Sequence, residues 1–355
     1  MFLAIFVLLH IKLDNFLTNK SGFKCLYKTE IMSKNIVLVG CGNVGSRHLQ
    51  ALVKVHQSIT IYVVEPNKNS QNLGKKRLDE ISYNKKNHKI FWLKSISELD
   101  KKSDVVIIAT NADGRVDLIK KLLACGYKRF LIEKFVCQST SEYKKLLSSM
   151  KKFKAKGWVN TNYPCFEGYQ KIKKCFKPTE TLSLSVLTYS GYGLSTQAIH
   201  YLALFSWLTN SDDIKLDGKY LKKELIPNKR SKSFKEFQGT LIGINNDNSF
   251  LKLTFLPSFN DSLIVKISGK NIHFILDEIH NTISVFNEKK PKKWNFKFEH
   301  VSSLTTKIIQ DILKKDDCLL PLVQDSYHSH SELFRIFNAH LKKIFNKDFK
   351  SCPIT

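Results

Sequence analysis

The most constraining feature of the chain is a glycine-rich stretch in its first fifty residues. Residues 36–48 read IVLVGCGNVGSRH. Four apolar residues lead directly into Gly40, Gly42 and Gly45, and helix-forming residues follow. A buried strand that ends on a G-x-G-x-x-G loop and continues as a helix is typical of the βαβ unit that binds dinucleotides.

Each glycine of this loop has an expected task. Gly40 should allow the tight turn, Gly42 the close approach of a pyrophosphate, and Gly45 the close packing of helix on strand. The free N–H groups at the helix start, where Asn43 and Val44 lie, are expected to bind the phosphates. The alternative is a glycine turn in an α/β fold that binds no ligand.

An acidic residue stands where such a unit needs one. Glu65 ends the next apolar run, twenty residues after Gly45. Its carboxylate can accept hydrogen bonds from the ribose hydroxyls of the adenosine, and it would repel a 2′-phosphate. The sequence therefore predicts NAD as the cofactor, with NADP disfavoured.

The first half of the chain alternates apolar runs with amphipathic stretches, which predicts a parallel sheet covered on both faces. We expect strands at 35–39, 59–64, 89–93, 104–109, 129–133 and 157–161. We expect helices at 44–56, 115–125 and 140–152, the last opened by the capping box of Ser139 and Glu142. Residues 33–162 are thus predicted to be a doubly wound NAD-binding domain.

The pattern changes after residue 163 to consecutive strands separated by short turns, which indicates a mostly antiparallel sheet. We expect strands at 181–189, 239–245, 249–256, 262–268, 271–276 and 281–286, and helices at 166–176, 195–208 and 325–345. Residues 210–237, rich in Lys and Asp, are interpreted as an exposed excursion. Residues 163–355 are thus predicted to be an α+β domain for substrate binding and oligomerisation, whose last helix packs back on the first domain. The fold class is α/β.

Residues 1–32 form a leader that we expect to be extraneous or disordered, with folding starting near Met32. The leader opens with MFLAIFVLLHI. This run is too short for a membrane span, which needs roughly 20 apolar residues. It also lacks the positive start and the small-residue cleavage site of a signal peptide. A weak membrane anchor is the alternative, and no stable membrane insertion is expected.

The net charge of +26 raises the question of nucleic acid. Only six of the 57 cations are Arg, and the Lys residues are dispersed over the whole chain. Because nucleic-acid recognition favours the planar fork of Arg, we predict no nucleic-acid partner.

The cysteines and histidines predict no metal site. The eight Cys contain no C-x-x-C pair and no zinc spacing, which favours reduced, mostly buried thiols in a cytoplasmic protein. His328 and His330 are two residues apart, so on a helix they face different ways, and His328 is expected to be solvated.

Several motifs together resemble the Gfo/Idh/MocA oxidoreductases. The Arg47–His48 pair after the glycine loop is similar to the end of the family's fingerprint. Further similar segments occur in the family's order, and they extend the resemblance over about residues 35–345, with some most similar to members from surface-polysaccharide loci. They are 109–111 (ATN), 131–134 (LIEK), 159–160 (VN), 169–171 (YQK), 193–194 (GL), 199–200 (IH), 207–208 (WL), 320–321 (LP), 325–326 (DS) and His330.

The resemblance implies hydride transfer between a nicotinamide and a sugar or nucleotide-sugar. It implies Lys134 as the residue that exchanges a proton with the sugar oxygen, and His200 as its partner acid/base or a substrate ligand. It also implies a homo-oligomer, because the family's open sheet face commonly pairs with its copy. The remaining residues that it implies are Thr110, Asn111, Glu133 and Asn160 for the cofactor, and Tyr163, Thr196 and Gln197 for the substrate.

The sequence also departs from the family. Phe135 stands where the family has Pro after the Lys. Thr196 and Ala203 stand where the family often has Asp near the His, and Tyr163–Pro164 where relatives of the polysaccharide type carry an Arg pair. The alternatives are therefore a surface lysine, a core histidine, and a catalytically degenerate NAD-binding regulator or paralogue.

Overall fold

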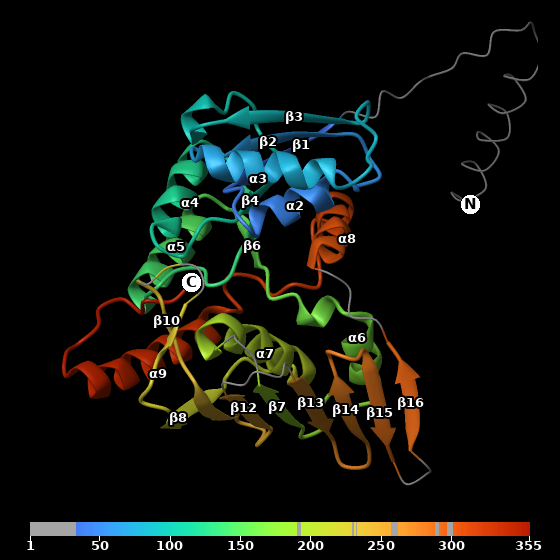
Figure 1. Ribbon diagram of the computed structural model, residues 1–355, viewed down its shortest axis with the longest axis vertical. Helices are drawn as coiled ribbons and strands as arrows, with labels where there is room; N and C mark the ends of the chain where they lie inside the picture. The colour runs from blue at the N-terminus through green and yellow to red at the C-terminus, as the bar shows by residue number, and fades with distance from the viewer. Residues whose placement is uncertain are drawn as a thin grey trace, which may run out of the picture. The chain divides into compact units, whose positions relative to one another are not determined.

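The computed structural model describes residues 33–189, 193–228, 231, 233–256, 262–287, 291–296 and 301–355 (Figure 1). The leader expected at 1–32 lies outside the described residues. Residues Ser33–Thr355 make up one unit of the chain. Among the residues described, no helix is both long enough and apolar enough to cross a membrane.

The first sheet is parallel throughout and has six strands in the order β3-β2-β1-β4-β5-β6. The chain order reverses between β1 and β4, and ligands of such sheets bind at this switch point, beyond the carboxyl ends of the strands. The strands are β1 (Lys34–Val39), β2 (Ile59–Val64), β3 (His88–Leu93), β4 (Val105–Ile108), β5 (Arg129–Ile132) and β6 (Lys156–Val159). All six were expected from the apolar runs, and the predicted doubly wound sheet is confirmed.

Helices cover both faces of this sheet. Figure 1 shows α2 (Gly45–Leu52) beside α3 (Lys68–Asp79), while α4 (Arg115–Ala124) packs against α5 (Thr140–Lys152). The expected cap of α5 is present, since the Ser139 side chain accepts a hydrogen bond from the Glu142 N–H. Helix α3 is absent from the sequence-based expectations because its sequence, KNSQNLGKKRLD, carries too few apolar residues for a helical stripe.

The second sheet has eight strands in the order β16-β15-β14-β13-β7-β12-β11-β8. Every neighbouring pair is antiparallel except β7 and β12, so the predicted, mostly antiparallel sheet is confirmed. Its strands are β7 (Ser183–Tyr189), β8 (Lys215–Leu221), β11 (Gly239–Ile244), β12 (Phe250–Leu256), β13 (Ser262–Ser268), β14 (His273–Asp277), β15 (Thr282–Phe286) and β16 (Lys292–Asn295). The two short strands β9 (Ile226–Pro227) and β10 (Lys235–Glu236) pair apart from it.

One face of the second sheet is buried and the other is open. Side chains alternate along β12, where Leu251 and Leu253 are fully buried and Lys252 between them is exposed. Figure 1 shows α7 (Leu194–Thr209) lying across the covered face, next to the short helix α6 (Glu167–Lys173). On the open face Leu187 and Ile275 keep more than a third of their surface exposed.

The interpretation of 210–237 as an exposed excursion is wrong. The segment contains β8, an edge strand whose backbone is covered by the last helix, α9 (Tyr327–Phe345). Arg335 of α9 donates to the Leu216 carbonyl oxygen at 2.7 Å. Just after the segment's buried Glu236, the Phe237 ring stacks on Phe337 with centroids 4.2 Å apart. The lysines of this segment hid its apolar positions in the sequence.

A second helix was also missed in the sequence. Helix α8 (Val301–Lys315) packs against α2 through buried Leu304, Ile308 and Ile312, which recur at helical spacing. The polar neighbours of these residues and the preceding run of lysines obscured the pattern.

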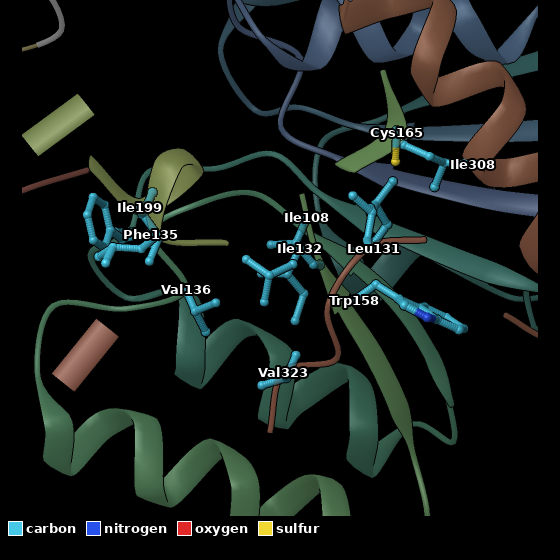
Figure 2. Packing of buried hydrophobic residues seen from close by; sticks show 14 of the residues in the cluster. Ile108, Leu131, Ile132, Phe135, Val136, Trp158, Cys165, Ile199, Ile308 and Val323 are labelled. Atoms are coloured by element: carbon cyan, nitrogen blue, oxygen red, sulfur yellow. The ribbon is translucent and has the colours of Figure 1, made fainter. Parts of the chain in front are cut away.

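The segment before α9 extends the first sheet. Val159 N–H donates to the Pro321 carbonyl at 2.9 Å, and Trp158 forms a bridge with Leu322. Figure 2 shows Val323 and Trp158 among the buried side chains around Ile132. The division into domains at 162/163 stays a prediction; it falls between β6 and β7.

The buried face of β12 supplies a stability test. Replacing Leu253 with Ala should lower the free energy of unfolding by about 2–5 kcal/mol, because its side chain has no exposed surface and leaves a cavity. Lys252→Ala, which truncates the exposed side chain between Leu251 and Leu253 on the same strand, is the matched control and should cost under about 0.5 kcal/mol. Urea unfolding followed by circular dichroism measures both. Equal costs would show that the two faces are not buried as described.

Candidate functional site

The glycine-rich loop joins β1 to α2 and has the geometry of a phosphate-binding turn. Gly40 has a φ of +88°, which favours glycine. A Cβ on Gly45 would lie 2.0 Å from the Gly40 carbonyl oxygen, so only glycine allows this approach of helix to strand. Around Gly42 a Cβ would meet nothing within 4 Å. The loop is therefore tight where it packs and open at Gly42, as close contact with a pyrophosphate requires.

A cleft of about 600 Å³ opens beside this loop, at the carboxyl ends of the strands. It is bounded by the ends of β1, β2 and β3, by the loop after β4, and by the first turns of α4. Its lining includes five of the residues expected to bind cofactor, which are Gly40, Gly42, Glu65, Thr110 and Asn111. Asn43, Val44 and Gly45 belong to the same loop but do not line the cleft. The position of the cleft at the carboxyl ends of the strands and the residues that line it both suit a dinucleotide.

Glu65 is held firmly at the edge of the cleft. Its Oε2 accepts a hydrogen bond from the Cys41 N–H at 2.7 Å, and its Oε1 accepts one from the Asn67 N–H at 2.9 Å. The side chain is buried, and Gln71 donates to its carbonyl oxygen. Because each carboxylate oxygen can accept more than one hydrogen bond, the fixed carboxylate keeps acceptor capacity toward the cleft.

Arg47 and His48, which follow the loop, lie in different environments. Arg47 is exposed and donates to Gln50. His48 is fully buried, with Nδ1 3.0 Å from Thr305 Oγ1 of α8 and Nε2 2.9 Å from Glu133 Oε1 at the end of β5. The histidine therefore joins α2, β5 and α8, and it does not line the cleft.

Glu133 and Asn160, which were expected at the cofactor, form this buried network with His48. Asn160 Nδ2 donates to Glu133 Oε1 at 2.5 Å. Burial alone would raise the pKa of Glu133, but hydrogen bonds from His48 and Asn160 and the charges of His48 and Lys134 lower that pKa to about 2. The carboxylate is thus ionised, and neither residue lines the cleft.

Arg115 was not recognised from the sequence, and it fixes the strand ends around the site. The side chain is buried. Its guanidinium donates to the carbonyl oxygens of Thr110, Glu133 and Phe135, which follow β4 and β5. Its rarity could have drawn attention to it, because it is one of only six arginines and opens a helix directly after the Thr110–Asn111 loop.

The loop after β4 also receives the segment that follows α9. Thr355 Oγ1 accepts a hydrogen bond from the Ala112 N–H at 3.1 Å, and Gln138 donates to the Ile354 carbonyl at 2.9 Å. Thr355 and Ile354 are both buried. No motif in the sequence pointed to this contact, because it joins positions more than two hundred residues apart.

Lys134 lies just beyond β5 and is buried, so the surface-lysine alternative does not hold. Its Nζ donates to the Thr196 carbonyl oxygen in the first turn of α7 at 3.0 Å. The Thr196 hydroxyl in turn donates to Glu236 Oε1. Burial raises the pKa of Glu236 above its ordinary value, although the hydroxyl of Thr196 and the charge of Lys134 act in the opposite direction. Glu236 was missed because it lies in the segment that was interpreted as an excursion.

The peptide bond between Lys134 and Phe135 is cis, although Phe stands where the family has Pro. The Phe135 ring is fully buried and makes an edge contact with His330, with centroids 5.3 Å apart. His330 Nδ1 donates to the Ser326 carbonyl at 2.8 Å, and its Nε2 accepts from the Val136 N–H at 3.3 Å. This pattern requires the neutral ring, and burial with the nearby charge of Arg115 lowers the pKa of His330 to about 4.

His200 lies on α7 against the loop that follows β6. Its ring stacks on Tyr163, with centroids 5.4 Å apart, and the Tyr163 hydroxyl donates to Tyr201 at 3.2 Å. Burial, with a smaller effect of the Lys134 charge, lowers the pKa of His200 to about 3. Its Nδ1 is buried and has no hydrogen-bond partner among the described residues. The imidazole is therefore neutral at pH 7, and one ring nitrogen is left for a partner.

Three residues expected at the catalytic or substrate site lie away from the glycine loop. Lys134 and His200 do not line the cleft beside that loop. Gln197 lies in the first turn of α7, where its N–H donates to the Gly193 carbonyl oxygen. The expectation that His328 is solvated is wrong in part, because the ring is half-buried and Nε2 lies 2.8 Å from the Ile214 carbonyl oxygen.

Comparison with known proteins identifies this architecture. Residues 34–161 match the model of the Gfo/Idh/MocA oxidoreductase family, NAD-binding Rossmann fold. Among curated proteins, none matches the sequence.

Three solved structures share the fold over most of both chains. An oxidoreductase from Agrobacterium radiobacter, in complex with NAD+, L-tartaric acid and magnesium, is 15% identical with a TM-score of 0.66, covering 88% of this chain and 97% of its own. UDP-N-acetylglucosamine 3-dehydrogenase GnnA from Acidithiobacillus ferrooxidans is 12% identical with a TM-score of 0.66, covering 86% and 97%. A Gfo/Idh/MocA family oxidoreductase from Vibrio cholerae is 14% identical with a TM-score of 0.65, covering 89% and 100%.

The sequence match, together with the glycine loop and its cleft, leads to one assignment: residues 34–161 are an NAD-binding Rossmann fold of the Gfo/Idh/MocA oxidoreductase family.

Proposed function

We propose that this oxidoreductase transfers a hydride to or from a sugar or nucleotide-sugar, with NAD as the preferred cofactor. The observation that carries the proposal is that Lys134, just beyond β5, lies near His200 of α7. Lys134 is buried and donates to a backbone carbonyl of α7, and His200 is neutral with a ring nitrogen that has no partner among the described residues. Groups that exchange a proton with a carbinol or ketone oxygen have these properties.

The cofactor would be held by the glycine loop, by Glu65 and by Thr110–Asn111. The openness at Gly42 suits the pyrophosphate of a dinucleotide, and the fixed carboxylate of Glu65 disfavours a 2′-phosphate. When bound, the nicotinamide accepts or gives the hydride. We assign Glu133 and Asn160 to support of the strand end next to Lys134, since hydrogen bonds engage both in the buried network with His48.

The substrate would meet Lys134 and His200 between the ends of β5 and α7. Lys134 is an ammonium donor already oriented by the Thr196 carbonyl, so it can give a proton to a sugar oxygen or stabilise that oxygen as it loses one. His200 is neutral, so it acts as an acceptor or orients a sugar hydroxyl. Tyr163, Thr196 and Gln197 complete the proposed substrate side.

Sugar chemistry is supported by the neighbour from Acidithiobacillus ferrooxidans, a UDP-N-acetylglucosamine 3-dehydrogenase. A role in surface-polysaccharide synthesis in the cytoplasm rests on the sequence motifs alone. A homo-oligomer formed through the open face of the second sheet completes the proposal, and the exposed Leu187 and Ile275 on that face support it.

The second candidate is a binding-only relative that has lost catalysis. It is favoured by Thr196 and Ala203, which leave no carboxylate on α7 near His200, and by Tyr163–Pro164 in place of an arginine pair. A screen of purified protein for NADH formation or loss with UDP-, GDP- and CMP-linked sugars separates the two. NAD binding without turnover on any sugar would support the binding-only candidate.

Lys134→Met tests the catalytic assignment. The variant keeps the length of the side chain and removes its charge, so turnover should fall by roughly 10² to 10⁴, the usual contribution of acid–base catalysis. NAD affinity should change little. Lys145→Met, on the exposed surface of α5, is the matched control. Undiminished turnover by Lys134→Met on the substrate found in the screen would remove Lys134 from the mechanism.

Glu65→Gln tests the cofactor preference. The amide keeps a hydrogen-bond acceptor but loses the negative charge that would repel a 2′-phosphate. The ratio of NADP to NAD affinity should rise about fivefold or more, since two unit charges 4 Å apart in water interact by about 1 kcal/mol. Calorimetric titration with both cofactors measures the ratio, and Glu80→Gln is the exposed control. Tighter binding of NADP than of NAD by the unmodified protein would contradict the assignment.

The oligomer is tested separately by light scattering at micromolar concentration. The unmodified protein should have a multiple of the 40.9 kDa chain mass. Leu187→Glu should shift it toward the monomer, because a charge would be buried in the paired sheet faces. A monomeric unmodified protein would reject this part of the proposal.

A further inference from the structure

A second cavity, of about 360 Å³, lies apart from the NAD cleft. It is bounded by α7, the turn after β6, and the segment from Leu319 to Ser329 that leads into α9. It shares no lining residue with the cleft beside the glycine loop, and neither Lys134 nor His200 lines it. Nothing in the proposed hydride transfer uses this space.

Two serines line this cavity. Ser206 Oγ is buried and has no hydrogen-bond partner among the described residues. Ser329, which is 4% exposed, lines the same cavity. Buried polar groups are nearly always satisfied, so the unpaired hydroxyl of Ser206 leaves a hydrogen-bonding group for a molecule bound in this cavity.

The walls between these hydroxyls are apolar. Ile199, Trp207 and Leu320 are among the apolar residues that line it. The ammonium of Lys173 lies 4.4 Å from the Trp207 ring centroid and its Nζ also donates to Asn210, so this lysine is already engaged. An indole ring and aliphatic side chains, with polar groups at separate points, suit a ring-shaped ligand that has C–H surfaces between its polar groups.

Two carboxylates stand at the cavity on exposed residues. Asp212 and Asp325 both line it. Burial raises the pKa of Asp325, and the nearby charge of Asp212 raises it further. Carboxylates accept hydrogen bonds from ligand hydroxyls and repel an anionic ligand. The pair therefore disfavours anions at this cavity, although the chain as a whole has a net charge of +26.

We propose that this cavity binds an uncharged, ring-shaped polyol of monosaccharide size, in a site separate from the hydride-transfer site. Ser206 and Ser329 exchange hydrogen bonds with its inner hydroxyls, Trp207 and Leu320 pack on its C–H surface, and Asp212 and Asp325 accept from its outer hydroxyls. The site does not depend on the proposed catalytic function and remains if the protein has no turnover.

Saturation-transfer NMR and titration with glucose, galactose, mannose and myo-inositol test the proposal on the full chain without nucleotide. At least one of the four should bind, and glucuronate, which carries the glucose ring with a carboxylate, should bind more weakly than glucose. The double variant Ser206→Ala/Ser329→Ala should weaken binding at least about fivefold, because two hydrogen bonds are lost. Ser149→Ala, on α5, is the control and should bind as the unmodified protein does.

A second variant guards against loss of folding in the first. Asp212→Asn/Asp325→Asn changes only exposed groups and should bring glucuronate binding closer to that of glucose. Circular dichroism establishes that each variant is folded. The proposal is overturned if none of the four polyols binds, if the serine variant is folded and binds unchanged, or if glucuronate binds the unmodified protein as tightly as glucose. NAD titration of the same samples reports on the hydride-transfer site independently.

Discussion

The buried carboxylate of Glu133 holds together the elements around the end of β5. An ionised carboxylate is costly to bury unless hydrogen bonds surround it, and here His48 and Asn160 supply them. These partners come from α2 and from the end of β6, and His48 is itself fixed by Thr305 of α8. One charge thus joins elements from distant parts of the sequence. Removing a single partner would leave the charge uncompensated, so the network is maintained as a unit.

The arrangement next to this carboxylate follows from the same constraint. Arg115 gathers the carbonyl groups around Glu133 and Phe135, which leaves the Lys134 side chain directed to α7. The placement of the lysine is therefore decided by backbone contacts of buried residues. Thr196 links Lys134 to Glu236, because its carbonyl oxygen accepts from Lys134 and its hydroxyl donates to Glu236.

The sequence predicted the fold well where a local pattern carries the information. The six apolar runs of the first sheet, the glycine loop with Glu65, and the strands from β11 to β15 follow from spacing alone. The edge strand β8 and helix α3 did not, because lysines and other polar residues mask their few buried positions. The roles of His48 and Arg115 could not be predicted either, since their partners lie far along the chain. Candidate catalytic residues were found only through the family's motifs, and their surroundings, such as Glu236, came from the structure.

The neutral ring of His330 ties the segment after Lys134 to α9, and this has a thermodynamic consequence. Folding lowers the pKa of His330 from an ordinary value near 6.5 to about 4. Between these two values the unfolded chain binds a proton that the folded chain does not, so acid favours unfolding in this range. Above a pH of about 6.5 the neutral His330 contributes fully to the stability of the fold, and this stability is lost progressively as the pH falls toward 4. Protonation would also remove the acceptor of the Val136 N–H. The contact between the segment after Lys134 and α9 is therefore weakened as the pH falls through about 4.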